Sequence, residues 1–379
     1  MRTIKLIYFF FTLLVVTSCS RDDDSPSGNN AVAARTVMVY MAANNSLASD
    51  AYTNLNQMEE GFTGIDGKLI VYARIFGQEP KIYEIVHDTS PDIKSKVLKK
   101  YGDHNSSDPA VMKMIFEDMK SLAPANSYGA ILWSHATNWV PANLGQLKTR
   151  SFGDDNSKSM DVQQLKSALP ANLDFLIFDA CSMASVEVLY ELRNVAPYIL
   201  ASPTEVLSVG MPYHQIGRLL YTPDVKTGLT ETAKAYVEYY RQKSGLEQSA
   251  TFSVVDTKQL PLLAQETKKL LQNNPDVIAK IGRNGVQRLD LDPNTPVSAY
   301  DYADMLDKYF PQEQLVSVKS ALSKAVIYKA NTPNFLGKPI NAFSGLSCYI
   351  PIESEAYLAP FYKTLSWSQD SAYGMLLRW

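Results

Sequence analysis

The sequence predicts an α/β protein with a mostly parallel β-sheet covered by helices on both faces, plus a mainly helical C-terminal part. The first observation is a series of short runs of β-branched, aliphatic and aromatic residues, which is typical of strands buried on both faces. The second is that helical patterns separate these runs, and strands that alternate with helices form parallel sheets. The runs occupy residues 36–41, 68–73, 81–86, 129–133, 174–178, 197–200, 250–255 and 347–350.

The helical segments are marked by apolar residues three or four positions apart, in residues 47–58, 111–119, 183–190 and 233–240. Asp108 and Pro109 form a favourable N-cap and first-turn pair for the second of these helices. From about residue 260 the pattern becomes mainly helical until the late apolar run. We therefore expect a sheet domain over residues 35–258 and a helical part over residues 259–379 that returns a strand to the sheet.

The composition excludes several classes of protein. The chain has 379 residues, of which 46% are hydrophobic and 20% are charged, so it can bury a real core and is not disordered. Its 36 basic and 39 acidic residues give a net charge of −3, which argues against a nucleic-acid-binding protein. Three cysteines are too few for a disulfide scaffold, and four histidines make a histidine-rich metal site improbable.

The N-terminus predicts export and membrane anchoring. Arg2 and Lys5 precede an apolar stretch, Leu6 to Val16, that is too short to span a bilayer comfortably, and small residues lead to Cys19. This pattern resembles a bacterial lipoprotein signal, so we expect residues 1–18 to be removed and Cys19 to be lipidated. Residues 19–34 are then a flexible tether, whose acids resemble surface-export signals of Bacteroidetes-type lipoproteins. The expected location is the cell envelope, at the outer membrane and surface-exposed.

Two predicted strands end in residues that carry chemistry. His135 follows the run that ends at Trp133, and Cys181 follows the run that ends at Phe178. Ligands of open α/β sheets bind at the carboxyl ends of the strands, so the two side chains are candidates for one site. A helix is expected to begin around Ser182, and a thiol at a helix N-terminus should have a lowered pKa. A cysteine with a neighbouring histidine is the minimum for thiol acyl transfer.

Other interpretations of these residues stay open on pattern alone. A cysteine in an apolar stretch is usually a small buried hydrophobe, and a histidine after a strand is usually structural. In an oxidising compartment Cys181 and Cys348 are also candidates for a disulfide. No HExxH or CxxC spacing occurs in the sequence, and no glycine-rich phosphate loop.

Five ordered blocks together resemble the clostripain family of cysteine peptidases, which has the caspase-like α/β fold. The blocks are residues 36–47, 131–139, 151–155, 175–187 and 344–351. The resemblance implies a cysteine endopeptidase with Cys181 as the nucleophile and His135 as the general acid and base. It places the oxyanion-binding N–H groups on Ala136 and Cys181. It also implies that Asp179 lines a pocket for Arg or Lys before the cleaved bond, with Glu205 as a helper.

The sequence departs from the family pattern at some positions. Ala136 stands where the family usually has Gly, and Asn44 stands where many members have Asp. A calcium ion is implied by the family resemblance alone, and no other cofactor is expected. Lys148 and Arg150 lie in a polar stretch where some members cleave themselves. The expected partners are peptide or protein substrates and the membrane. The alternative function is a catalytically inactive homologue that serves as a surface binding lipoprotein.

Overall fold

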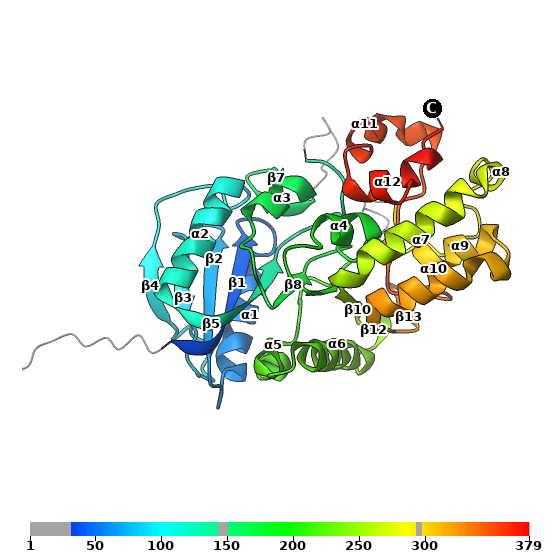
Figure 1. Cartoon of the computed structure of the whole chain (residues 1–379). Coiled ribbons are helices and arrows are strands. Elements are labelled where there is room, and N and C mark those ends of the chain that lie inside the picture. Colours follow the sequence, from blue (N-terminus) through cyan, green and yellow to red (C-terminus); the bar gives the residue numbers. More distant parts are fainter. Residues whose placement is uncertain (1–31, 143–150, 293–297, 379) are drawn as a thin grey trace, which may run out of the picture. The chain divides into compact units, whose positions relative to one another are not determined.

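The structure is a computed structural model that describes residues 32–142, 151–292 and 298–378. The part from Val32 onwards forms one compact unit around a nine-stranded sheet with the strand order β12-β10-β9-β8-β5-β1-β2-β3-β4 (Figure 1). The strands of this sheet are β1 (Ala33–Ala43), β2 (Lys68–Ile75), β3 (Lys81–Glu84), β4 (Lys96–Lys100), β5 (Ala125–Trp133), β8 (Phe175–Asp179), β9 (Tyr198–Ala201), β10 (Thr251–Asp256) and β12 (Val326–Asn331).

The centre of the sheet is parallel and its edges are antiparallel. The pairs β1–β2, β1–β5, β5–β8 and β8–β9 run parallel. The pairs β2–β3, β3–β4, β9–β10 and β10–β12 run antiparallel. The predicted α/β class is therefore confirmed, in the form of a mixed sheet. Its parallel centre brings the carboxyl ends of β1, β5 and β8 to one edge.

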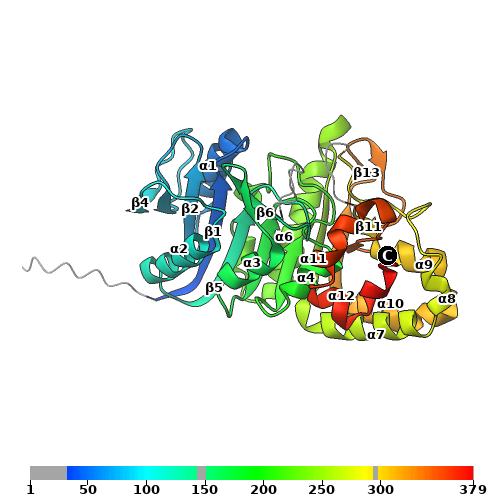
Figure 2. The ribbon, with the colours of Figure 1, turned by 90° about the horizontal axis from the view of Figure 1, so that it is seen from above.

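Helices cover both faces of the sheet because its central strands alternate their apolar side chains between two cores. Met38 and Tyr40 of β1 belong to one core, whereas Val37 and Val39 belong to the other. The first core is covered by α2 (Pro109–Leu122), α3 (Val162–Ala168), α4 (Val186–Glu191) and α7 (Leu260–Gln272), and the second by α1 (Ala48–Gly61), α5 (Tyr213–Ile216) and α6 (Val225–Arg241) (Figures 1 and 2).

The C-terminal part is mainly helical and packs into the first core. Its further α-helices are α8 (Pro275–Ile278), α9 (Tyr302–Tyr309), α10 (Gln312–Ala325), α11 (Ala359–Tyr362) and α12 (Ser366–Asp370). The strand that it contributes to the main sheet is β12, directly after α10. The predicted late strand is much shorter: β15 (Ser347–Cys348) pairs with β11 (Tyr300–Asp301) and bridges to Ser185, outside the main sheet.

Two short hairpins bear on the site. One consists of β6 (Phe152–Asp155) and β7 (Lys158–Met160), and the other of β13 (Asn334–Phe335) and β14 (Lys338–Pro339). The helix expected to begin around Ser182 begins later, because α4 starts at Val186 after the N-cap Ser185. Residues between Cys181 and α4 instead bond to the segment after β9: the Ser182 N–H donates to the Thr204 carbonyl at 2.7 Å.

Candidate active site

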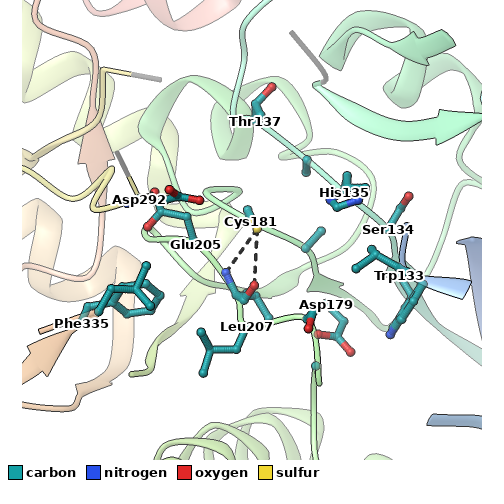
Figure 3. A pocket seen from close by; sticks show the side chains of 17 residues that line it. Trp133, Ser134, His135, Thr137, Asp179, Cys181, Glu205, Leu207, Asp292 and Phe335 are labelled. Atoms are coloured by element: carbon teal, nitrogen blue, oxygen red, sulfur yellow. Dashed lines mark hydrogen bonds between the residues drawn. The ribbon is translucent and has the colours of Figure 1, made fainter. Parts of the chain in front are cut away.

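The sheet register brings His135 and Cys181 together. Trp133 of β5 is paired with Asp179 of β8, and each candidate lies two residues beyond its paired strand end. Because neighbouring strands lie about 5 Å apart, the two side chains emerge at equivalent positions on adjacent strands. Figure 3 shows both of them in one pocket. The structure thus places the two predicted residues in the same site.

The backbone on both sides of the pocket is held in place. The Ser134 hydroxyl donates to the Ala42 carbonyl at 2.7 Å, which ties the end of β5 to the end of β1. Ser182 has a φ of 60°, in the left-handed region that is unfavourable for residues with a Cβ. This conformation turns the chain sharply after Cys181, and backbone strain of this kind concentrates at functional sites.

The Cys181 thiol contacts the backbone of Val206. Sγ accepts the Val206 N–H at 3.3 Å, and the thiol donates to the Val206 carbonyl at 3.6 Å (Figure 3). Burial raises the pKa of Cys181 to about 12, against the lowering effect of the Val206 N–H. Glu205, Asp179 and Asp292 raise the pKa of this thiol further through their negative charges. The expected lowering of its pKa by a helix N-terminus is wrong for this state, because α4 begins only at Val186.

His135 is positioned by the loop that follows β1. Its Nε2 lies 3.0 Å from the Ser46 hydroxyl. The neighbouring Asn45 holds this loop against β6, since its side-chain amide donates to the Asp154 carbonyl at 2.8 Å. Asn44 donates to the buried Asp155 carboxylate at 2.6 Å. The loop that contacts the imidazole through Ser46 is thus itself fixed to the β6 strand.

Ala136 has a backbone geometry that suits an oxyanion donor. It forms an isolated antiparallel bridge with Phe152, in which the Thr137 N–H donates to the Ser151 carbonyl and the Gly153 N–H donates to the His135 carbonyl. In a bridge of this type the N–H groups of the two opposed residues point away from each other. Ala136 is not among the described residues with positive φ, so this backbone has no need of Gly.

Asp179 is buried beside the thiol and has one carboxylate oxygen without a hydrogen-bond partner. Only 4% of the residue is exposed. Oδ2 accepts the Met211 N–H at 3.0 Å and the Tyr213 hydroxyl at 2.8 Å, whereas Oδ1 has no partner. Burial raises the pKa of Asp179 to about 6, and its two hydrogen bonds oppose that rise. A buried carboxylate oxygen without a partner is costly, and a cationic side chain would satisfy it.

Gly210 leaves the space beside this carboxylate. A Cβ at this position would lie 2.8 Å from Asp179 Oδ2 and 2.9 Å from Asn54 Oδ1. Gly210 also has a φ of 69°, which a side chain would disfavour. The absence of a side chain here keeps the Asp179 end of the pocket open.

Glu205 also lines the pocket, but its carboxylate is already engaged. Oε2 accepts the Leu291 N–H at 3.1 Å, and Oε1 accepts the Asp292 N–H at 3.0 Å. Burial raises the pKa of Glu205, and these backbone donors oppose the rise. Its structural task is thus to fix the 291–292 segment against the loop that contacts Cys181. This leaves Asp179 as the better candidate for binding a basic side chain.

The pocket has a volume of about 500 Å³ and includes residues that the sequence analysis did not identify. These are Leu47, Trp133, Leu207, Asp292, Phe335 and Leu336. Asp292 and the β13–β14 hairpin come from segments far away in the sequence. Neither segment has a motif that marks a site, so only the tertiary contacts reveal them.

The structure bears on some of the remaining predictions and leaves others untested. Cys19, Lys148 and Arg150 lie outside the described residues. Cys181 and Cys348 are both free, so the disulfide interpretation is wrong. In the part of the chain that the structure describes, no group of three or more His, Cys, Asp or Glu could hold a metal ion. Asn44, at a position where many family members have Asp, donates to Asp155. Within the same ranges, no helix is long and apolar enough to cross a membrane.

Comparisons with known proteins agree with this architecture. The model of the clostripain family matches residues 39–369. An inactive zymogen C11 protease from Parabacteroides distasonis has 32% identity and a TM-score of 0.78, with 90% of this chain and 98% of that chain covered. A secreted C11 cysteine protease from Bacteroides thetaiotaomicron, in complex with an irreversible peptide inhibitor, has 28% identity and a TM-score of 0.78, with 90% and 99% covered.

Clostripain from Hathewaya histolytica is 23% identical in an alignment of 224 residues that covers 48% of this chain and 41% of that protein. A sheet of this type, with a cysteine and a histidine at the ends of neighbouring parallel strands, is the architecture of a cysteine peptidase with the caspase-like fold. The family match spans most of the chain, and the chain belongs to the clostripain family.

Proposed function

We propose that the protein is a cysteine endopeptidase that cleaves peptide bonds with Cys181 as the nucleophile and His135 as the general acid and base. One observation carries this proposal. Trp133 and Asp179 are paired in the sheet, and His135 and Cys181 each lie two residues further along, so the imidazole and the thiol share one pocket. The related protease from Bacteroides thetaiotaomicron, which is bound to an irreversible peptide inhibitor, supports a peptide as the substrate.

The proposed reaction moves one proton at a time. His135 takes the thiol proton, and Cys181 Sγ attacks the carbonyl carbon to form a tetrahedral oxyanion, which the N–H groups of Ala136 and Cys181 stabilise. His135 then gives its proton to the leaving amine, and the acyl-enzyme remains. A water molecule, deprotonated by His135, releases the acid and restores the thiol. Because the thiol contacts the Val206 backbone in this state, the first step requires it to exchange that contact for one with the imidazole.

The specificity that we propose is for Arg or Lys at P1, the residue before the cleaved bond. Asp179 supports it because it lines the pocket and its buried Oδ1 has no hydrogen-bond partner. A guanidinium or ammonium group would supply the missing hydrogen bond and balance the buried charge. Glu205 contributes negative potential rather than a direct bond, because both of its oxygens already accept backbone N–H groups.

A peptidyl electrophile with a basic P1 residue tests the dyad. The folded wild-type chain should be labelled at Cys181, and Cys181→Ala should not be labelled. His135→Ala should be labelled far more slowly, because the thiol then lacks its base. Cys348→Ala is the matched control and should behave as wild type, since Cys348 is buried and lies outside the pocket. Labelling of Cys181→Ala at the wild-type rate would contradict the assignment.

A second candidate function is a homologue that binds peptides without cleaving them. The observation that favours it is the protonated thiol, which is bonded to Val206 rather than directed at the imidazole. The relative from Parabacteroides distasonis is an inactive zymogen, so inactive forms occur among similar proteins. The two functions differ in turnover. In a peptide-library assay a peptidase cleaves the peptides, whereas a binding protein retains peptides that are recovered uncut.

We further propose that Cys19 carries the lipid that anchors the protein in the cell envelope, at the outer membrane and exposed at the surface. Small residues precede this cysteine and an acidic, polar stretch follows it. Fractionation of cells that express the wild type or Cys19→Ala tests the anchor. The wild type should partition with membranes and the variant with the soluble fraction, and identical partitioning of the two would contradict it.

A further inference from the structure

The hairpin of β13 and β14 brings apolar side chains to the active-site pocket from the C-terminal part of the chain. Phe335 pairs with Lys338, so the turn consists of Leu336 and Gly337 alone. Phe335 is fully buried and Leu336 is half-buried, and both line the pocket. Leu207, from the loop after β9, lines it as well. These three side chains form an apolar wall, which we call the hairpin wall.

Leu336 holds its position at a conformational cost. Its φ is 46° and that of Gly337 is 75°. Two-residue hairpin turns with positive φ at both positions favour Asn-Gly or Asp-Gly, because small polar residues tolerate this region better than an aliphatic side chain does. A leucine here is therefore unfavourable for the turn itself. Its presence is explained if the side chain serves the pocket.

Several hydrogen bonds fix the hairpin relative to the thiol. The Leu336 N–H donates to the Ser249 hydroxyl at 2.7 Å. The Lys338 ammonium donates to the Leu291 carbonyl at 2.7 Å. The Leu291 N–H donates in turn to Glu205, whose neighbour Val206 contacts Cys181. The hairpin wall is thus connected to the loop that borders the nucleophile, and it forms a defined surface.

The chemistry assigns this wall to the part of the substrate before P1. His135 must protonate the leaving amine, so the residues after the cleaved bond lie on the His135 side of Cys181. In Figure 3, Phe335 lies on the opposite side of Cys181 from His135. The P1 side chain is directed to Asp179. Because side chains alternate along an extended peptide, the neighbouring P2 side chain points away from the Asp179 end of the pocket.

We propose that Leu336, with Phe335 and Leu207, forms an apolar subsite that selects an aliphatic or aromatic residue at P2. This inference rests on the proposed peptidase function and extends its specificity beyond P1. The wall offers no charge to a P2 side chain, and burial of apolar surface is the interaction it provides. The preference for Leu or Phe over Gly at P2 should be on the order of tenfold or more.

The test is a library of fluorogenic peptides with Arg at P1 and all residues at P2, assayed with the wild type and with Leu336→Asn. Asn suits the left-handed turn, so Leu336→Asn should melt at the wild-type temperature or above it. In this variant the preference for Leu or Phe over Gly at P2 should be mostly lost. Its kcat/KM for Gly at P2 should fall only a few-fold. Leu336→Met keeps an apolar side chain and should keep the preference.

A matched control is Val316→Asn on α10, which removes an exposed apolar side chain that does not line the pocket. This variant should show the wild-type P2 profile. An unchanged P2 profile in Leu336→Asn, or a change confined to residues after the cleaved bond, would overturn the subsite and leave the dyad in place. A wild-type chain that cleaves no member of the library would overturn the proposed function, and the subsite with it.

Discussion

Among single residues, Ser46 has a role that its exposed position does not suggest. Its hydroxyl lies 3.0 Å from His135 Nε2, so it fixes the orientation of the ring. We therefore propose that Ser46 is a positioning residue, which acts on the reaction through the imidazole.

Replacing Ser46 with Ala should lower kcat roughly ten- to hundredfold and leave KM nearly unchanged, because a misaligned base slows proton transfer without weakening binding. Ser46→Thr keeps the hydroxyl and should retain most of the activity. Ser49→Ala removes an exposed hydroxyl from the first turn of α1 and serves as the control. Steady-state kinetics across pH decide the matter, and equal kcat in Ser46→Ala and Ser49→Ala would exclude the positioning role.

Asp179 should make the specificity depend on pH. Burial raises its pKa from 3.8 to about 6, so the carboxylate that we propose as the partner of a basic P1 residue forms only as the pH rises through this value. The ratio of kcat/KM for Arg and for a neutral P1 residue should rise with pH around 6, and the titration of the dyad cancels in this ratio. In Asp179→Asn the ratio should be low and independent of pH. A wild-type ratio that stays flat between pH 5 and about 8 would contradict this assignment.

The same residue should reduce stability at neutral pH. When folding raises the pKa of a carboxyl group, the folded state holds the proton more tightly than the unfolded state does. The folded state therefore loses stability as the pH rises from about 4 to about 6. Asp179→Asn escapes this loss. The variant should be more stable than the wild type at pH 8 by on the order of 2 to 3 kcal/mol, and equally stable near pH 4, in urea unfolding. If Asp179→Asn were less stable than the wild type, and more so at pH 8 than at pH 4, the predicted sign of the stability change would be contradicted.

At the scale of elements, the sequence was sufficient where a buried apolar run dictates a strand, and insufficient where tertiary hydrogen bonds intervene. The ends of β5 and β8 were predicted because apolar residues stop there and polar ones begin, and this located His135 and Cys181. The start of α4 was not predicted. Apolar spacing continues from Met183, but the N–H groups of Ser182 and Ala184 bond to carbonyls after β9, which keeps this stretch out of the helix.

The cap of α4 connects this helix to the histidine loop. The Ser185 hydroxyl accepts the Val188 N–H at 3.2 Å and donates to the Asn138 side chain. Ser185→Ala should lower the free energy of unfolding by about 1 to 2 kcal/mol, because it removes the cap and a buried bond. Ser185→Thr should recover most of the lost free energy of unfolding. Ser167→Ala, at an exposed site on α3, is the control. Equal unfolding midpoints for Ser185→Ala and Ser167→Ala would contradict this prediction.

On the scale of the whole molecule, the active site joins two halves of one sheet. His135 and its loop come with β1 and β5, whereas Cys181 and Asp179 come with β8. The sequence pattern predicted the strands but not their neighbours, because pairing between β5 and β8 is a tertiary contact. The edge strand β12 was missed for a different reason. Its residues are half-exposed, so its sequence shows no continuous buried run.

A chain cut between the two halves should remain assembled and active. We propose that self-cleavage occurs after Lys148 or Arg150, between β5 and β6. Across this break, residues 129–133 of β5 pair with residues 175–179 of β8. Asn44 donates to Asp155, and the His135 carbonyl accepts the Gly153 N–H at 2.9 Å. Both halves bury apolar side chains in the same two cores. These contacts do not depend on an intact connection.

Intact-mass analysis should therefore show two fragments for the wild type and one full-length species for Cys181→Ala. Under native conditions the two fragments should elute together at the volume of the uncut chain, and they should separate only in denaturant. The cut chain should melt within a few degrees of the uncut variant, because loop closure contributes little compared with the buried core. Fragments that separate on native gel filtration would show that the β5–β8 pairing does not hold the halves together. A mass pattern that is the same in both proteins would assign any cut to another protease.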